Sequence, residues 1–194
     1  MPPMLSSRPA SALAGKKLLL NDERLTLVHA TEAHGSTADA TWPIKRTTAD
    51  LHQLWLWKQI LADHPHERFA LVDDGDQPVA FWCSSKKSPI VLSGIRHYRL
   101  DYVEVRPQDR GGLSGYAVLA LIAARAVERG ADRLVLAAFD VPGLVDFYER
   151  TVGARRGCPA GWNPPPMLVP FVIEEKMLIH LKEFADALFE DGEA

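Results

Sequence analysis

Apolar and polar residues alternate or cluster along the 194-residue chain in patterns that predict strands and helices in turn. Residues 24–30 alternate as a half-buried strand does, whereas residues 133–139 are almost continuously apolar and predict a strand buried on both faces. Two apolar runs flank the acidic turn Asp73–Gln77, which is typical of a β-hairpin. The strands expected from these patterns cover residues 24–30, 69–72, 78–83, 89–93, 98–105, 133–139 and 171–173.

Apolar residues at helical spacing predict the helices. Residues 51–61 have one apolar face, with Asp50 as the expected N-cap. Residues 116–129 form a longer apolar run that ends at Gly130, a residue type common just after a helix. The remaining expected helices cover residues 141–151 and 174–189. The expected loops cover 31–48, where one helical turn is left open, and the proline-rich 157–170.

Composition limits the organisation and the class of protein. The Ser-, Pro- and Ala-rich residues 1–22 are expected to form a flexible N-terminal arm, and residues 23–194 a single domain. Hydrophobic residues make up 47% of the chain, enough for a sizeable core. A net charge of −3 indicates no general attraction to nucleic acid, and no apolar run approaches the ~20 residues of a membrane span. Two cysteines make no disulfide framework, so we expect a reduced, cytoplasmic setting.

A glycine-rich turn separates the strand ending at Val105 from the helix beginning at Tyr116. Gly111, Gly112 and Gly115 remove Cβ atoms from this turn. Backbone N–H groups and the positive end of the helix dipole would then meet at one point, which is a suitable site for phosphate oxygens. No Gly-Lys-Ser/Thr follows, so the turn is not a Walker P-loop. A turn that merely caps the helix remains the alternative.

Two segments carry a resemblance to a known family. One is Val105-x-Pro-x-x-Arg-Gly-x-x-x-Gly115, and the other is Phe147-Tyr-Glu-Arg-Thr-Val-Gly153. With the order of the expected elements, they resemble the pyrophosphate-binding turn and the Phe-Tyr-x-Lys/Arg-x-Gly segment of the GNAT acetyltransferase superfamily. The resemblance covers residues 98–154. The chain departs from the family pattern at Leu113, where the family has glycine, at Val141, where it often has asparagine, and by one additional residue before Gly153.

The resemblance implies an α/β (α+β) fold, with a mixed, mainly antiparallel sheet of about six to seven strands flanked by helices. It also implies a site for acetyl-CoA as co-substrate, without a metal. The pantetheine arm would pair with the backbone of Val103 and Val105 as an added strand does. The pyrophosphate would be bound by backbone amides of the turn, which comprises Arg110, Gly111, Gly112, Leu113, Ser114 and Gly115.

The resemblance further implies Tyr148 as the general acid, because a tyrosine is protonated at neutral pH and can donate to the departing thiolate. Glu104 is the candidate base, on one face of its strand with Tyr102, while Asp101 is expected on the opposite face. An exposed strand glutamate is the alternative for Glu104. The pair His64 and His66 resembles metal ligands but has no second cluster, so a solvated loop is expected there.

These features together predict an acetyl-CoA-dependent N-acetyltransferase, which is an acyltransferase in which a primary amine attacks the thioester directly. The acceptor is expected to be a small-molecule or peptide amine, and a homodimer is left open. Trp162, in the proline-rich loop, is the candidate for a substrate lid. Two rivals remain: a catalytically silent acyl-CoA-binding domain, and a protein whose C-terminal amphipathic helix packs on a partner chain.

Overall fold

The sheet of the protein is mixed and mainly antiparallel, as predicted, and nine of its strands lie within the described residues. The computed structural model describes residues 11–42, 56–65, 67–85, 88–110 and 113–189. The strand order is β1-β2-β3-β4-β6-β7-β9-β8, with β5 paired to β6 outside this path. The strands are β1 (Lys17–Leu20), β2 (Glu23–His29), β3 (Arg68–Val72), β4 (Pro78–Ser84), β5 (Ile90–Leu92), β6 (Ile95–Val105), β7 (Arg133–Phe139), β8 (Arg155–Arg156) and β9 (Leu168–Ile173).

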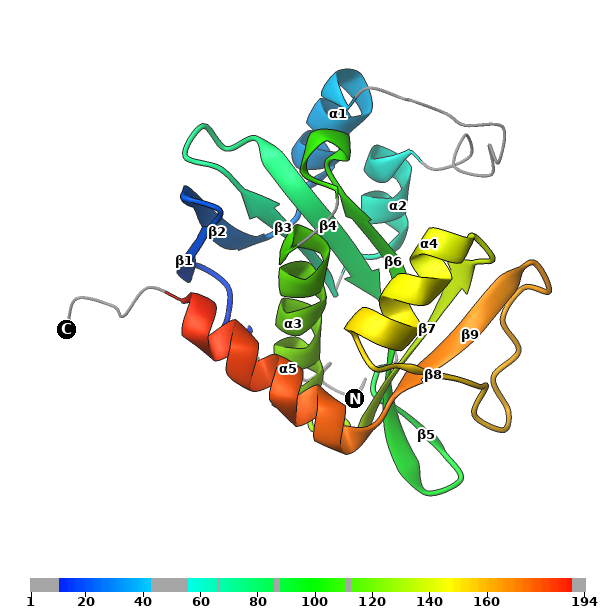
Figure 1. Cartoon of the computed structure of the whole chain (residues 1–194). Helices are drawn as coiled ribbons and strands as arrows, with labels where there is room; N and C mark the ends of the chain where they lie inside the picture. Colours follow the sequence, from blue (N-terminus) through cyan, green and yellow to red (C-terminus); the bar gives the residue numbers. More distant parts are fainter. Residues whose placement is uncertain (1–10, 43–55, 66, 86–87, 111–112, 190–194) are drawn as a thin grey trace, which may run out of the picture.

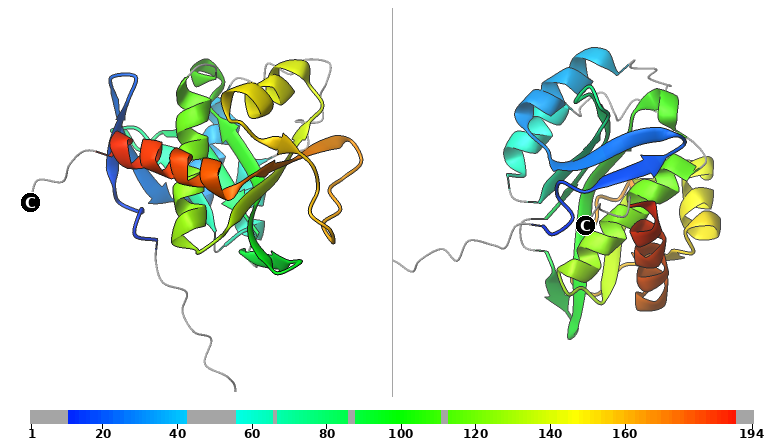
Figure 2. Two further views of the ribbon diagram at one scale, coloured as in Figure 1. Left: turned by 60° about the horizontal axis from the view of Figure 1, so that its bottom comes forward. Right: turned by 90° about the vertical axis from the view of Figure 1, so that its left-hand side faces the viewer.

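Helices cover both faces of this sheet (Figures 1 and 2). α3 and α5 lie on one face, where their apolar residues join the larger core with Trp82 and Phe171. α1 and α2 lie on the other face over a smaller core that contains Phe81. The helices are α1 (Glu32–Thr41), α2 (Trp57–Asp63), α3 (Leu113–Glu128), α4 (Pro142–Asp146), which continues into a π-helical turn (Phe147–Thr151), and α5 (Glu175–Leu188).

The sheet exceeds the predicted six to seven strands because two short strands were missed. β8 lies in the expected helix-to-strand connection, and β1 lies within the expected N-terminal arm. The expectation of a loose arm is therefore wrong for Lys17–Leu20, which pairs with β2. Leu18 and Leu20 of β1 face the core, so the strand is held by apolar burial as well as by hydrogen bonds. Residues 1–10 lie outside the described part.

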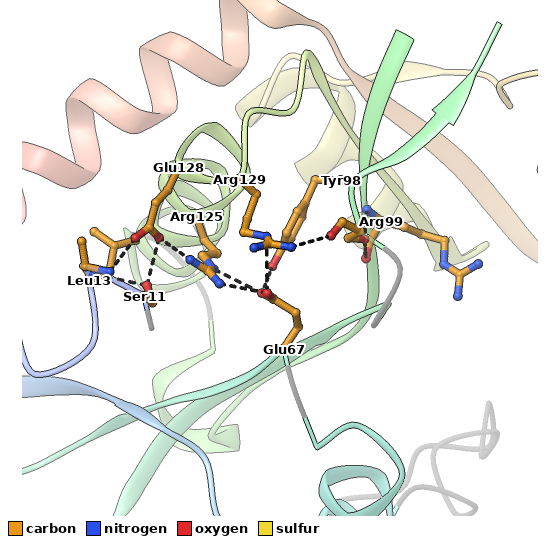
Figure 3. A network of polar contacts seen from close by, with 10 residues as sticks. Ser11, Leu13, Glu67, Tyr98, Arg99, Arg125, Glu128 and Arg129 are labelled. Atoms are coloured by element: carbon orange, nitrogen blue, oxygen red, sulfur yellow. Dashed lines mark hydrogen bonds and ion pairs between the residues drawn. The ribbon is translucent and has the colours of Figure 1, made fainter. Parts of the chain in front are cut away.

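A charge network that runs from a buried centre to the surface fixes the N-terminal segment to α3 (Figure 3). The Ser11 hydroxyl and the Ala12 N–H donate to the Glu128 carboxylate at 2.9 and 2.5 Å. Arg125 donates to Glu128 at 2.6 Å and to Glu67 at 2.9 Å. The fold therefore takes in residues that composition alone assigns to a disordered arm.

Glu67 is the centre of that network. Its side chain is 1% exposed and accepts hydrogen bonds from Arg125 and from the Tyr98 hydroxyl, the latter at 3.1 Å. Arg129 lies 3.5 Å from the same carboxylate and donates to the Ser88 carbonyl oxygen at 3.1 Å. A buried carboxylate persists in an apolar core only when its charge is paired and its oxygens are hydrogen-bonded, and both conditions hold here.

α1 occupies a segment that was expected to be a loop. Its buried residues are small, Gly35 and Ala38, so it lacks the large apolar stripe that makes a helix recognisable in sequence. The reason is a close approach of α2: a Cβ on Gly35 would lie 2.6 Å from the backbone nitrogen of Lys58. Asp39 of α1 also accepts the Trp57 N–H at 2.8 Å and caps α2 from outside. The predicted cap Asp50 lies outside the described residues.

α5 packs on its own chain. Leu178, Leu181 and Ala185 are buried, and the ring of Phe184 contacts Tyr116 of α3 edge-on, with centroids 5.0 Å apart. This arrangement covers the apolar face that could otherwise have bound a partner. Among the described helices, none combines the length and apolar character that crossing a bilayer requires.

Candidate functional site

The site begins where β6 and β7 part. The two strands pair in parallel from His97 to Arg99, which lies opposite Val135. Beyond that point β6 pairs only with β4, through Leu100–Val105, while β7 continues along β9 (Figure 1). A strand that is interior for half of its length becomes an edge strand for the other half. Such an edge presents unpaired backbone donors and acceptors to a ligand.

The orientation of the backbone identifies which residues face this opening. The Arg106 N–H donates to the Val79 carbonyl of β4 at 2.7 Å. Because N–H and C=O groups alternate sides along a strand, the backbone groups of Val105 and Val103 point away from β4, toward the opening. These are the two residues that the family resemblance assigns to the pantetheine arm. The Val105 carbonyl also accepts a hydrogen bond from Arg110 Nε at 3.1 Å.

A β-bulge on β6 lies beside the opening. Cys83 of β4 pairs with Tyr102 and Ser84 pairs with Leu100, so Asp101 is the additional residue. Asp101 lies 3.6 Å from His64 Nε2, and the Tyr102 ring contacts the same histidine edge-on. The expectation that Asp101 and Tyr102 lie on opposite faces is therefore wrong, because the bulge interrupts the two-residue alternation on which it was based.

His64 is part of the site rather than of a solvated loop. Its side chain is 20% exposed, and its Nδ1 lies 2.9 Å from the Ile60 carbonyl oxygen. The Asp101 carboxylate raises the pKa of His64, against the opposing effect of burial. Within the described residues no group of three or more metal-ligating side chains is found, and His66 lies outside them.

The turn between β6 and α3 is described in part. A single 3₁₀ turn, Pro107–Asp109, leads to Arg110, while Gly111 and Gly112 lie outside the described residues. α3 begins at Leu113, three residues before the expected start. Buried Ser114 accepts a hydrogen bond from Asn21 Nδ2 at 3.1 Å. A Cβ on Gly115 would lie 3.5 Å from the Phe147 ring, so this glycine marks where α3 approaches the π-helical turn.

Both carboxylate oxygens of Glu104 have partners. Trp57 Nε1 donates to Oε2 at 2.7 Å, and Arg110 Nη2 is ion-paired with Oε1. Glu104 therefore connects α2 to the residue that begins the glycine turn. It lies on the α2 side of β6, as Tyr102 does, and its side chain is 21% exposed. Action as a base would require one of these partners to exchange for a water molecule.

Tyr148 lies in the π-helical turn and is buried. Its ring packs between Phe147 and Phe171, with centroids 5.3 and 5.1 Å away. Burial raises the pKa of Tyr148 to about 12, so the hydroxyl is protonated at physiological pH. The Val152 N–H donates to the Phe147 carbonyl, five residues back, at 3.0 Å. The π turn thus accommodates the additional residue noted before Gly153, since a π turn contains one residue more than an α turn.

A pocket of about 570 Å³ opens beside the point where β6 and β7 diverge. The proline-rich loop before β9 forms one wall, and Trp162 lies in it, where a substrate-contacting residue was expected. Sequence reasoning missed Arg99 and gave His64 no role, although both line this pocket. The lining residues are His64, Arg99, Leu100, Asp101, Tyr102, Ala137, Phe139, Trp162, Asn163, Pro164, Pro165, Met167 and Leu168.

Several solved structures share this fold at low sequence identity. A GNAT-family acetyltransferase from Listeria monocytogenes matches with a TM-score of 0.59 at 10% identity, over 81% of this chain and 99% of that one. A spermidine N-acetyltransferase chimera that includes Vibrio cholerae sequence matches with a TM-score of 0.57 at 11% identity, over 80% and 98%. The NatC complex bound to a Gag peptide and CoA matches with a TM-score of 0.53 at 9% identity, over 77% and 98%.

The sequence itself identifies the family. Residues 32–154 match the model of the acetyltransferase (GNAT) family, so the chain belongs to that family. A comparison with curated proteins found no match. The family assignment implies acyl-CoA-dependent N-acylation in general, and the fold is the one expected from the two motifs.

Proposed function

We propose that the protein is an N-acetyltransferase that transfers the acetyl group of acetyl-CoA to a primary amine. The observation that carries this proposal is the separation of β6 from β7 after Arg99 and Val135, which leaves the backbone of Val103 and Val105 facing an opening. An extended amide-containing arm can pair with such an edge through main-chain hydrogen bonds. The N-terminus of α3 follows β6 at the same end of the strand.

The described residues can bind acetyl-CoA, the acetyl donor, if the Arg110 side chain rearranges. Ser114 and Gly115 lie in the first turn of α3, where N–H groups lack partners within the helix and attract phosphate oxygens. Gly111, Gly112 and Leu113 are proposed to complete the pyrophosphate site with Arg110. The Arg110 side chain now binds the Val105 carbonyl and Glu104. The donor would share or displace the first of these contacts.

Tyr148 is proposed to act as the general acid. The neutral amine attacks the thioester carbonyl, a C–N bond forms, the C–S bond breaks, and the departing thiolate takes the Tyr148 proton. Solvent then restores that proton. Burial raises the pKa of Tyr148 to about 12, so the hydroxyl carries its proton at neutral pH and has it available to donate. The proton lost by the amine passes to water or, as proposed for the base, to Glu104.

Binding and turnover test this function separately. Acetyl-CoA should raise the melting temperature, since a ligand that binds only the folded state stabilises it by mass action. Release of free CoA thiol with an amine panel should then report transfer. A stabilised protein that releases no thiol with any amine would instead be the silent acyl-CoA-binding domain. The departures from the family pattern at Leu113 and Val141 are the observation that favours this second candidate.

Tyr148→Phe tests the acid. It should lower kcat by roughly 10²–10⁴-fold, the usual contribution of a positioned acid, while the thermal shift with acetyl-CoA persists. Tyr116→Phe is the matched control, because Tyr116 packs on Phe184 of α5 and has no part in the proposed site. Equal turnover by the two variants would remove Tyr148 from the mechanism.

A further inference from the structure

The side chains that line the pocket beside the diverging strands restrict which amine can bind there. Apolar and aromatic side chains from β7 and the proline-rich loop, among them Phe139, Trp162 and Met167, make up much of the lining. Among the described residues of this lining, Asp101 is the sole carboxylate. A ligand that fills this space must therefore bury an apolar body, which is favourable by ~25 cal/mol per Å² of apolar area.

The charge of Asp101 is already compensated from two sides. Arg99 donates to its two oxygens from Nε and Nη2, at 2.7 and 3.3 Å. His64 Nε2 lies 3.6 Å away on the other side. A polyamine needs several uncompensated carboxylates, and the described wall of this pocket does not offer them. Asp101 is better suited to orient Arg99 than to bind a second cation.

Arg99 is held as an anion-binding group. Its backbone N–H donates to Ser88 Oγ at 2.9 Å, and its guanidinium is fixed by the two bonds to Asp101. Its Nη1 makes no hydrogen bond to the described part of the chain, and 34% of the side chain is exposed. A guanidinium that is permanently charged, fixed and left with unused N–H donors matches the geometry of a carboxylate.

The position of Arg99 on β6 places its guanidinium beside the proposed thioester site. Arg99 is the last residue of β6 that pairs with β7, so it stands at the apex of the opening. The proposed thioester site lies along the strand edge that starts one residue later. An acceptor whose carboxylate is bound by Arg99 would keep its amine within the same opening.

We propose that the acceptor is an α-amino acid with a large apolar side chain, with its carboxylate bound by Arg99 and its side chain packed against Trp162 and Phe139. This inference rests on the proposed N-acetyltransferase function and names the substrate class of the same site. It separates this chain from enzymes that acetylate polycationic acceptors.

Turnover of three amines tests the proposal. L-Phenylalanine should be the preferred acceptor over 2-phenylethylamine, which lacks only the carboxylate, and over spermidine. Arg99→Gln should lower kcat/KM for L-phenylalanine by roughly 10- to 100-fold, the loss expected for a hydrogen bond between charged groups, and should not lower it for 2-phenylethylamine. Arg96→Gln is the matched control, since Arg96 lies on the same strand, pairs with Asp132 at 3.0 Å and is not part of the lining.

A binding measurement without CoA separates the two proposals. Calorimetry should show N-acetyl-L-phenylalanine binding more tightly than N-acetyl-2-phenylethylamine, with the difference lost in Arg99→Gln. If this difference is found but acetyl-CoA neither binds nor is turned over, the pocket inference stands and the transferase function fails. If acetyl-CoA is turned over but the carboxylate gives no advantage, or spermidine is preferred, the amino-acid inference is overturned.

Discussion

Two carboxylates of this protein have similar partners and opposite surroundings. Glu67 and Asp101 each lie between an arginine and a second basic side chain, Arg129 for Glu67 and His64 for Asp101. Glu67 is 1% exposed and its cluster is closed by Tyr98, whereas Asp101 is 17% exposed and borders a pocket. The closed cluster has its charges matched internally and holds elements together. The open cluster around Asp101 leaves N–H donors of Arg99 available to bind a ligand.

Ser88 joins the two clusters. Its hydroxyl accepts the Arg99 N–H, and its carbonyl accepts Arg129 Nη2 (Figure 3 shows both arginines). The open cluster is therefore anchored to the closed one through a single buried residue. The comparison predicts that damage to the closed side reduces stability, while damage to the open side changes binding.

The largest effect is expected from Glu67→Gln. The change would leave the buried guanidinium groups of Arg125 and Arg129 with Glu128 as their remaining counter-charge and should cost about 3–5 kcal/mol of unfolding free energy. Urea denaturation would measure it. Asp101→Asn is the matched control, and its cost should stay below about 1 kcal/mol because that carboxylate is partly solvated. Equal losses in the two variants would erase the distinction between closed and open clusters.

A smaller effect is expected from Ser88→Ala. The change leaves the Arg99 N–H without its acceptor in a buried position and should cost about 1–3 kcal/mol. It should also raise KM for a carboxylate-bearing amine, because Arg99 loses its anchor while kcat has no reason to fall. Ser36→Ala, which removes an exposed helix hydroxyl, serves as control and should leave both quantities nearly unchanged. A change in kcat alone would contradict this link.

The smallest effect concerns the pH dependence of the open cluster. Asp101 raises the pKa of His64 above its unfolded-state value of about 6.5. The stability contributed by the His64–Asp101 attraction is therefore fully present below about pH 6.5. It is lost as the pH rises through the higher folded-state pKa. Asp63, which also raises this pKa, and the Ile60 carbonyl face the same ring. NMR titration should find the His64 pKa lowered in Asp101→Asn. The stability difference between that variant and the parent should shrink from about pH 5 to pH 9, and a constant difference would refute the coupling.

The central part of the fold could be predicted from sequence, because β6, β7 and α3 have long and unambiguous apolar patterns. α1 could not, since the close approach of α2 demands Gly35 and Ala38 where pattern analysis requires large residues. The additional residue before Gly153 was visible in the sequence, but the sequence pattern does not show that a π turn containing Tyr148 accommodates it.

The pocket was less predictable than the strand edge. Val103 and Val105 were expected from the family resemblance alone, and the backbone groups of both residues point away from β4. Arg99, Asp101 and His64 come together because a bulge adds one residue to β6 and because the end of α2 reaches that bulge. Neither event leaves a local signature in the sequence, although an arginine and an aspartate two residues apart on one strand could have suggested a pair.

The contacts of Ser11 and Ala12 with Glu128 change where a minimal version of this domain should start. A chain shortened to begin at Lys17 would keep the nine described strands and every residue of the pocket. Glu128 would nevertheless lose two of its hydrogen-bond donors, so the carboxylate that pairs with Arg125 would be held less firmly. A truncation placed at the first strand would thus weaken the C-terminal end of α3. A purification tag is better joined ahead of Ser11.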